Sequence, residues 1–312
     1  MEMKSPLIGL APMDGVTDAA CRFIMDTYGH PDLLYTEFVS VAGLPFGRPA
    51  LSRRLLKHKT NTSIIAQLFG NEPELFYKAT LKVLELGFAG VDINMGCPDR
   101  SVFSRGGGAA LILQPALAVA IIGSVKKAVK DWGRQKIPVS VKTRTGYKNH
   151  QTKEWLGRLL AAEPAMICLH GRTYAQKYAG KADWEQIGLA AQLAQNSATK
   201  IFGNGDIKSR DEALAKAAEY RLAGVLIGRA ALGNPWIFQG ETPTLEQRIE
   251  VILAHCRQFN RFFPQGDFRA MRKHLGWYAK GFAGAAKVRK ALMGVNNIEE
   301  VKSIFSSQVV EY

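Results

Sequence analysis

Apolar and β-branched residues recur in eight short runs along the first three quarters of the chain. These runs cover residues 7–13, 33–39, 64–70, 90–96, 138–146, 166–173, 200–207 and 224–232. Segments with the apolar spacing of amphipathic helices lie between them, at residues 74–86, 116–130, 155–162, 184–194 and 209–220. Such regular alternation of strand and helix is typical of βαβ units in a parallel sheet. Eight units in about 230 residues predict an α/β fold, a (β/α)8 TIM barrel.

The pattern changes after residue 240, where no further strand is predicted. Residues 244–262 have the spacing of an amphipathic helix, and residues from 268 onward predict two or three more. Pro243 and a turn at residues 264–266 separate these segments. We therefore predict two domains, a catalytic barrel at residues 1–240 and a small helical domain at residues 241–312.

One cysteine follows a predicted strand directly. Cys97 lies in the turn Gly96-Cys97-Pro98, and the loop after it contains Arg100, Arg105 and three consecutive glycines at 106–108. A thiol at the exit of a buried strand, beside residues without bulk, is placed for chemistry. A free cysteine can also simply fill space in a core. The local sequence leaves both interpretations open.

Polar side chains gather at the carboxyl-terminal end of every predicted strand. A TIM barrel turns all these ends to one face, where its active site lies. The sequence therefore predicts a site at the barrel mouth. Its candidate residues are Pro12, Met13, Asp14, Glu37, Gln67, Asn94, Cys97, Lys142, Arg144, His170, Arg172, Asn204, Gly205, Asp206, Gly228 and Arg229.

The residue types at this mouth suit a phosphorylated heterocycle. Residues 203–206 precede a predicted helix, and Gly228-Arg229 follows the eighth strand, as in the phosphate site of many barrels. Lys142 can stabilise an electron-rich ring, and Gln67 offers a donor and an acceptor to a ring edge. Flavin mononucleotide (FMN) fits this description. No Gly-x-Gly-x-x-Gly dinucleotide fingerprint opens the chain.

Composition narrows the class of protein. Of the 312 residues, 47% are hydrophobic, which is ample for a core, and no apolar run is long enough to span a membrane. The strand pattern begins within a few residues of Met1, so we expect no signal peptide. The four cysteines lie about 70 to 90 residues apart without a Cys-x-x-Cys pair, so we expect no metal site and no disulfide framework. A reducing cytoplasm is the expected location.

The net charge of +14 is unusual for an enzyme that handles only a small neutral metabolite. Basic residues cluster at 48–59 and at 126–136, and the predicted helical domain places Arg272 and Lys273 near Trp277 and Tyr278. Such an excess favours a polyanionic partner, nucleic acid first. A basic surface that serves only solubility is an equally good interpretation of charge alone.

Four motifs in this order resemble the tRNA-dihydrouridine synthase family. They are residues 11–18 (Ala-Pro-Met-Asp-Gly-Val-Thr-Asp), 94–98 (Asn-Met-Gly-Cys-Pro), 170–173 (His-Gly-Arg-Thr) and 204–207 (Asn-Gly-Asp-Ile). The similarity runs from Leu7 to residues 272–278. The helical tail and the Asn-Met-Gly-Cys-Pro form resemble the bacterial B-type branch, and residues 106–110 resemble the C-type pattern.

The resemblance implies an FMN enzyme that uses NADPH to reduce the 5,6 double bond of particular uridines in the D-loop of tRNA. It implies that Cys97 is the catalytic residue, which protonates carbon 5 of the base after hydride reaches carbon 6. We also expect a monomer. The residues that match the family's flavin contacts are Pro12, Met13, Asp14, Gln67, Lys142, His170, Asn204, Gly205, Asp206, Gly228 and Arg229.

Other residues are candidates for contact with the RNA substrate, and two further functions compete. The substrate candidates are Glu37, Asn94, Arg100, Arg105, Arg144, Arg172, Arg272 and Lys273. Glu37 either lines the site near the base or pairs with an arginine. A small-molecule flavin reductase of a pyrimidine or an enone would not need the excess charge. An RNA-binding barrel without catalysis would not need Cys97 together with Lys142 and His170.

Overall fold

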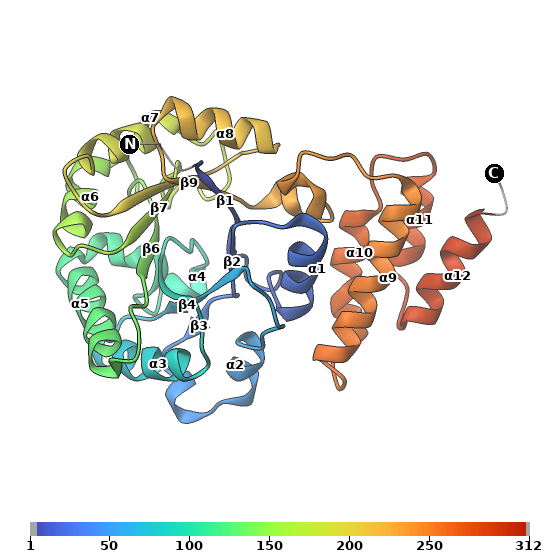
Figure 1. The fold of residues 1–312 in the computed structure, drawn as a ribbon, viewed down its shortest axis with the longest axis horizontal. Coiled ribbons are helices and arrows are strands. Elements are labelled where there is room, and N and C mark those ends of the chain that lie inside the picture. The colour runs from blue at the N-terminus through green and yellow to red at the C-terminus, as the bar shows by residue number, and fades with distance from the viewer. Residues whose placement is uncertain (1–4, 310–312) are drawn as a thin grey trace.

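Eight parallel strands close into a barrel in the computed structural model, which describes residues 5–309 (Figure 1). The strands are β1 (Leu7–Leu10), β2 (Leu33–Tyr35), β4 (Ser63–Phe69), β5 (Gly90–Met95), β6 (Val139–Arg144), β7 (Met166–His170), β8 (Lys200–Asn204) and β9 (Gly224–Ile227). The first strand pairs with both β2 and β9, and β2 pairs with β4, so the ring is closed. The predicted (β/α)8 barrel is confirmed.

The second predicted strand, residues 33–39, is interrupted. After β2 the chain leaves the ladder, and a short β3 (Val39–Ser40) then pairs again with β4. The Thr36 hydroxyl takes the place of the missing ladder bonds, because it accepts from the Gln67 N–H at 3.0 Å and donates to the Glu37 carbonyl at 2.7 Å. The interruption turns Glu37 toward the barrel mouth, where its carboxylate accepts from the Gly15 N–H.

Helices cover the outside of the barrel (Figure 1). They are α1 (Ala19–Gly29), α2 (Pro49–Arg54), α3 (Pro73–Glu85), α5 (Pro115–Trp132), α6 (Thr152–Ala161), α7 (Trp184–Leu193) and α8 (Arg210–Glu219), whereas α4 (Arg100–Phe103) lies on the loop that follows Cys97. The side chains of Asp18, Asp183 and Ser209 cap α1, α7 and α8, which fixes where these helices begin. The long connection from β5 to α5 contains α4 and a 3-10 helix, Gly108–Leu113.

Inside the barrel, a lower apolar layer lies beneath an upper polar one. The apolar layer contains Tyr35, Ile65, Cys168, Phe202 and Leu226. Side chains two residues apart on a strand face the same way, so the residue two positions after each of these apolar residues also points into the barrel. These are the polar candidates of the sequence. The apolar layer therefore lies directly beneath the polar side chains of the mouth.

The C-terminal helices lie at one side of the barrel (Figure 1). They are α9 (Leu245–Phe262), α10 (Arg272–Tyr278), α11 (Ala285–Leu292) and α12 (Ile298–Val309). Thr244 begins α9 with a reciprocal capping box to Gln247, and the helix predicted at 244–262 is confirmed. The core of these helices includes Ala19, Ala20 and Ile24 of α1. Because α1 belongs to both parts, the division at residue 240 stays a prediction.

Candidate active site

Lys142 of β6 and Asn204 of β8 are joined across β7 at the barrel mouth. The Lys142 Nζ donates to Asn204 Oδ1 at 3.0 Å, and Asn204 Nδ2 donates to the Leu226 carbonyl at 2.7 Å. Burial lowers the pKa of Lys142. An ammonium group uses only one of its three donors on Asn204, so it has donors left for a ligand above it.

The turn that carries Cys97 is held from below by Asn94. The Asn94 Oδ1 accepts from the backbone N–H groups of Gly96 at 3.1 Å and Cys97 at 2.9 Å. The Cys97 carbonyl in turn accepts from the Ala109 N–H at 3.2 Å. Burial raises the pKa of the Cys97 thiol. The thiol therefore keeps its proton at neutral pH and can act as a proton donor.

Arg144 and three stacked rings fasten the loops around Cys97 to one another. The Arg144 side chain is buried, and it donates to the carbonyls of Gly96 at 2.8 Å, Thr173 at 2.9 Å and Lys177 at 2.9 Å. The stacked rings are Phe103, Tyr147 and Tyr174, with centroids 4.2 to 5.7 Å apart. Arg144, a predicted RNA contact, is thus engaged with the backbone of the protein itself.

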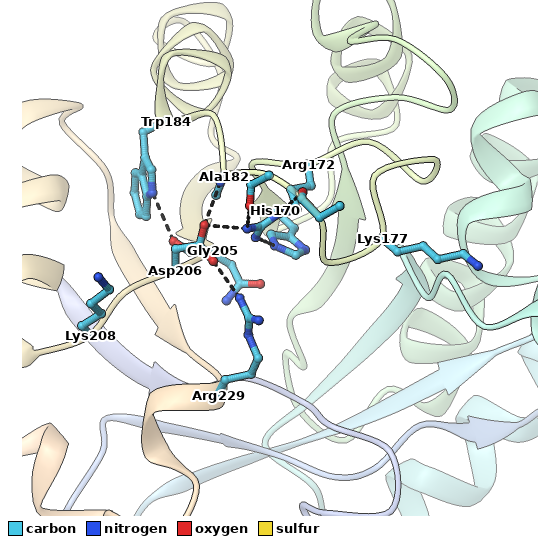
Figure 2. Close-up of polar contacts among 12 residues, drawn as sticks. His170, Arg172, Lys177, Ala182, Trp184, Gly205, Asp206, Lys208 and Arg229 are labelled. Carbon is cyan, nitrogen blue, oxygen red and sulfur yellow. Dashed lines mark hydrogen bonds and ion pairs between the residues drawn. The ribbon is translucent and has the colours of Figure 1, made fainter.

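At the other side of the mouth, Asp206 lies between two arginines (Figure 2). Its Oδ2 accepts from Arg172 Nη2 at 2.6 Å and from the Ala182 N–H at 2.8 Å, and its Oδ1 accepts from Arg229 Nη2 at 2.7 Å. Burial favours a higher pKa for Asp206, but these hydrogen bonds and the two positive charges outweigh it and lower the pKa. Asp206 is therefore an anion that holds both guanidinium groups in place.

His170 is a neutral acceptor beside this cluster (Figure 2). Burial and the cations Lys142, Arg144, Arg172 and Arg229 hold the pKa of His170 well below its usual value. Arg172 Nη1 lies 3.3 Å from His170 Nε2. Because a guanidinium can only donate, Nε2 is the accepting nitrogen and Nδ1 carries the proton.

Glu37 and Asp14 meet Arg54 at the edge of the mouth nearest α1. The Glu37 Oε1 accepts from the Gly15 N–H at 2.8 Å and lies 3.6 Å from Arg54 Nη1. Arg54 also forms an ion pair with Asp14. Burial raises the pKa of Glu37, and Arg54 opposes that shift. Glu37 thus pairs with an arginine and lies at the barrel mouth, and its place near the base stays a prediction. Pro12 and Met13 lie beside it, partly buried, in the turn after β1.

Comparison with known proteins decides the family. Residues 9–311 match the model of the dihydrouridine synthase family. A probable tRNA-dihydrouridine synthase of Staphylococcus aureus (strain MRSA252) is 32% identical over 324 residues, with 99% of this chain and 96% of the relative covered. The chain belongs to the dihydrouridine synthase family. A probable tRNA-dihydrouridine synthase 2 of Bacillus subtilis (strain 168) is 33% identical and covers 97% of this chain and 94% of its own length.

The dihydrouridine synthase fold also resembles solved structures of other enzymes. The 2-naphthoyl-CoA reductase complex matches with a TM-score of 0.54 at 9% identity, over 74% of this chain and 49% of that one. Morphinone reductase matches with a TM-score of 0.50 at 12% identity, over 80% and 94%. At these identities the likeness concerns the fold alone. The resemblance seen in the sequence motifs, and with it the prediction of an oxidoreductase, is confirmed by the family match.

Some of the cations predicted to contact RNA in this member of the dihydrouridine synthase family are exposed, and others are already engaged with the protein itself. Arg100 and Arg105 are exposed on the loop that follows Cys97. Arg272 is engaged with the carbonyls of Gly294 and Val295 and with Asn296 Oδ1. Lys273 is exposed, and its Nζ lies 3.6 Å from the point where a Cβ on Gly15 would be. Lys273 thus brings a cation from the C-terminal helices to the mouth.

The second basic cluster, residues 126–136, lies at the far end of the barrel. Helix α5 runs opposite to the strands, so its C-terminal end is away from the mouth. Consistent with this, Lys126 Nζ donates at 2.9 Å to the Ala162 carbonyl, just before β7. Among residues 5–309, no helix has the length and apolar character to span a bilayer. Across those same residues, no three His, Cys, Asp or Glu side chains form a group that could bind a metal.

One polar residue below the mouth was not predicted. Asp92 is fully buried in β5, where it accepts from Ser140 Oγ at 2.5 Å and from Gln67 Nε2 at 2.8 Å. Burial raises its pKa to about 6, although both hydrogen bonds oppose the shift. The signal was present in the sequence, because an aspartate in an apolar strand two residues before Asn94 must share the inward face with it.

Proposed function

We propose that the protein is a tRNA-dihydrouridine synthase that reduces the 5,6 double bond of specific uridines in tRNA, with FMN as cofactor and NADPH as reductant. The observation that carries the proposal is the convergence of a protonated thiol, Cys97, with the Lys142–Asn204 pair and the Asp206–Arg229 pair at one barrel mouth. A monomer located in the cytoplasm belongs to the same proposal.

The residues at the mouth fit FMN. A Cβ added to Gly228 would come no nearer to a neighbour than 3.8 Å, so the backbone beside Arg229 is open to a ligand. The Arg229 side chain is 57% exposed and oriented by Asp206, as a phosphate partner should be. We assign the phosphate to Gly205, Gly228 and Arg229, and the ring to Lys142 and Gln67. The remaining proposed contacts are Pro12, Met13, Asp14, His170, Asn204 and Asp206.

The side chains of the protein have separate roles in the proposed reaction. When bound, FMN supplies the hydride that uracil accepts at carbon 6. The Cys97 thiol gives its proton to carbon 5, since its raised pKa keeps that proton available. Asn94 holds the turn that carries the thiol. Lys142 Nζ and the Nδ1–H of neutral His170 both offer hydrogen-bond donors to the ring system, since His170 Nε2 already accepts from Arg172.

The surface around the mouth supports a folded RNA as substrate. A paired or stacked uridine must leave its stack to reach a site at the barrel mouth, which costs a few kcal/mol. Phosphate contacts from exposed cations can offset this cost. Arg100, Arg105 and Lys273 are exposed near the mouth and are our candidates for these contacts. We place the target in the D-loop, around positions 16 to 20, on the family resemblance.

Cys97→Ala tests the proposal. We expect the variant to fold and to retain FMN, but to reduce uridine in unmodified tRNA about 10²- to 10⁴-fold more slowly, because it lacks the proton donor. Single-turnover formation of dihydrouridine is the measurement, and mapping dihydrouridine in tRNA from a strain without the enzyme identifies the position. A variant as fast as the wild type would refute the role of Cys97. Faster reduction of free uracil or an enone than of tRNA would favour the small-molecule reductase.

A further inference from the structure

A continuous chain of hydrogen bonds runs from the interior of the barrel to the backbone of Cys97. It begins at Asp92, passes through the side-chain amides of Gln67 and Asn94, and ends at the N–H groups of Gly96 and Cys97. We propose that Asp92 is a positioning residue for Cys97, whose carboxylate fixes the orientation of both amides and through them the turn that carries the thiol. The inference rests on the proposed function only in taking Cys97 as the proton donor.

The strand register brings the members of this chain together. Gln67, Asp92 and Ser140 are direct partners across β4, β5 and β6, so their side chains leave the sheet on the same face. Asn94 lies two residues beyond Asp92 on that face. All four side chains are buried. The side chains of this hydrogen-bond chain therefore lie on the strands of the barrel and not on a loop.

The hydrogen-bond types give the chain one direction. An ionised carboxylate only accepts, so Gln67 must turn its NH₂ group to Asp92, at 2.8 Å. The Gln67 Oε1 then faces Asn94 and accepts from its Nδ2 at 3.0 Å. The Asn94 Oδ1 is left to accept two backbone N–H groups, at 3.1 and 2.9 Å. If Gln67 were reversed, its oxygen would face the Asp92 carboxylate and its NH₂ group would face the NH₂ group of Asn94. If Asn94 were reversed, its NH₂ group would face the two backbone N–H groups.

The reaction is sensitive to this arrangement because the thiol must lie close to one carbon atom of the base. A displacement of about 1 Å at a reacting group can reduce a rate by about 10²-fold. Asp92 has no exposed surface and lies beside Gln67 on the neighbouring strand, so it acts through the amides and not on the substrate. Ser140 supports it from the far side, through the hydrogen bond from its Oγ to Asp92 Oδ1.

Two substitutions at Asp92 separate the hydrogen-bond chain from the charge. Asp92→Asn keeps an oxygen toward Gln67 and turns its NH₂ group to Ser140, whose hydroxyl can accept. The chain therefore survives without the charge. Asp92→Leu has similar bulk and leaves the Gln67 amide without a partner. Ser140→Ala is the matched control, because it removes a hydrogen bond to Asp92 on the side away from the amides.

The test uses two readouts on the purified full-length protein. The first is the rate at which iodoacetamide alkylates Cys97, followed by mass spectrometry. Cys21, Cys168 and Cys256 are buried, and their labelling reports any unfolding. The second is single-turnover dihydrouridine formation at saturating tRNA, together with the Kd for tRNA.

We expect Asp92→Leu to alter the alkylation rate and to slow the reaction about 10- to 100-fold with an unchanged Kd. Asp92→Asn and Ser140→Ala should stay within about 3-fold of the wild type in both readouts, since the chain survives in each. If iodoacetamide labels the three buried cysteines in Asp92→Leu, Gln67→Met replaces it, because it breaks the hydrogen-bond chain one link later. Gln67 is also a proposed ring contact, so the alkylation rate of the flavin-free protein is then the deciding readout.

Wild-type alkylation and turnover in the broken-chain variant would overturn the inference. So would an Asp92→Asn variant as impaired as Asp92→Leu, since the charge and not the chain would then matter. A wild-type protein that forms no dihydrouridine would instead overturn the proposed function, and the alkylation experiment would still decide whether Asp92 positions Cys97.

Discussion

Asp206 and Arg229 illustrate how single side chains prepare the mouth for an anion. Asp206 satisfies Arg172 on one oxygen and Arg229 on the other, and the ring of Tyr178 lies 5.7 Å from the Arg229 guanidinium. Arg172 is buried, whereas Arg229 remains more than half exposed. The inner arginine therefore serves the fold, and the outer arginine is the one available to a phosphate.

We expect Arg229→Ala to lose FMN, because the substitution removes the exposed cation of the proposed phosphate site. Flavin absorbance per protein after gel filtration measures the loss. Arg158→Ala, an exposed arginine on α6, is the control and should keep the flavin content of the wild type. Full flavin content in Arg229→Ala would mean that the phosphate binds elsewhere.

Asp92 predicts a dependence of stability on pH. Its pKa of about 6 in the folded protein exceeds the ordinary 3.8, so the folded state binds the proton more tightly than the unfolded chain. The free energy of unfolding should therefore fall as pH rises from 3.8 through 6, by about 3 kcal/mol. The Asp92→Asn variant has no carboxyl group at this position to titrate, so its free energy of unfolding should not fall in this way.

Thermal unfolding of both proteins between pH 4.5 and 7.5 measures the difference. The advantage of Asp92→Asn should be small at pH 4.5 and should grow toward neutral pH. A constant difference across that range would show that the carboxyl group does not titrate as described.

At the scale of elements, the sequence predicts the positions of the strands, but it does not predict every hydrogen bond that the residues at the strand ends make. Gln67, Asn94, Lys142, His170 and Asn204 could be identified because each follows apolar residues at a strand end, and the strand period sets their direction. The interruption after Tyr35 could not be predicted, since it depends on the Thr36 hydroxyl replacing ladder bonds with β4. The buried position of Arg144 depends on its hydrogen bonds to carbonyls in two other loops, and the spacing of residues along the chain does not reveal these contacts.

The loop after Cys97 depends on Gly108. This residue has a φ of +60°, and an added Cβ would lie 2.9 Å from the Cys97 carbonyl oxygen. We expect Gly108→Ala to destabilise the protein by about 1 to 3 kcal/mol and to slow dihydrouridine formation, because strain and contact both displace the Cys97 turn.

Thermal unfolding and single-turnover rates test this expectation. Gly123→Ala, in the middle of α5, is the matched control, since a Cβ there meets nothing within 4 Å and alanine favours helix. It should leave the rate unchanged and stabilise the protein. If both glycine variants behave alike, the conformation of Gly108 does not hold the turn.

At the scale of the whole molecule, charge is divided between two ends of the barrel. Lys273 lies at the mouth beside Gly15, whereas Lys130 lies in the basic cluster at the opposite end. The net charge of +14 gave no indication of this division, because it depends on the direction of α5. The cations at the mouth are the ones nearest to an RNA whose uridine is bound there.

We therefore expect Lys273→Ala to weaken tRNA binding and to reduce the slope of log affinity against log salt by about 1, since one phosphate contact is lost. Lys130→Ala is the control and should leave the slope unchanged. Flavin reduction by NADPH should be normal in both. Equal effects of the two substitutions would mean that tRNA binding is diffuse and is not centred on the mouth.

The sharing of α1 between two cores has a consequence for synthesis of the chain on the ribosome. Ala19, Ala20 and Ile24 are among the first residues made, yet they belong to the same core as Leu275 and Leu292, which are among the last. Until those residues emerge, an apolar face of the first helix remains open to water. The strands of the barrel are made before the C-terminal helices, so the apolar face of α1 stays exposed in a chain that ends near residue 240. We expect a chaperone to bind such a chain.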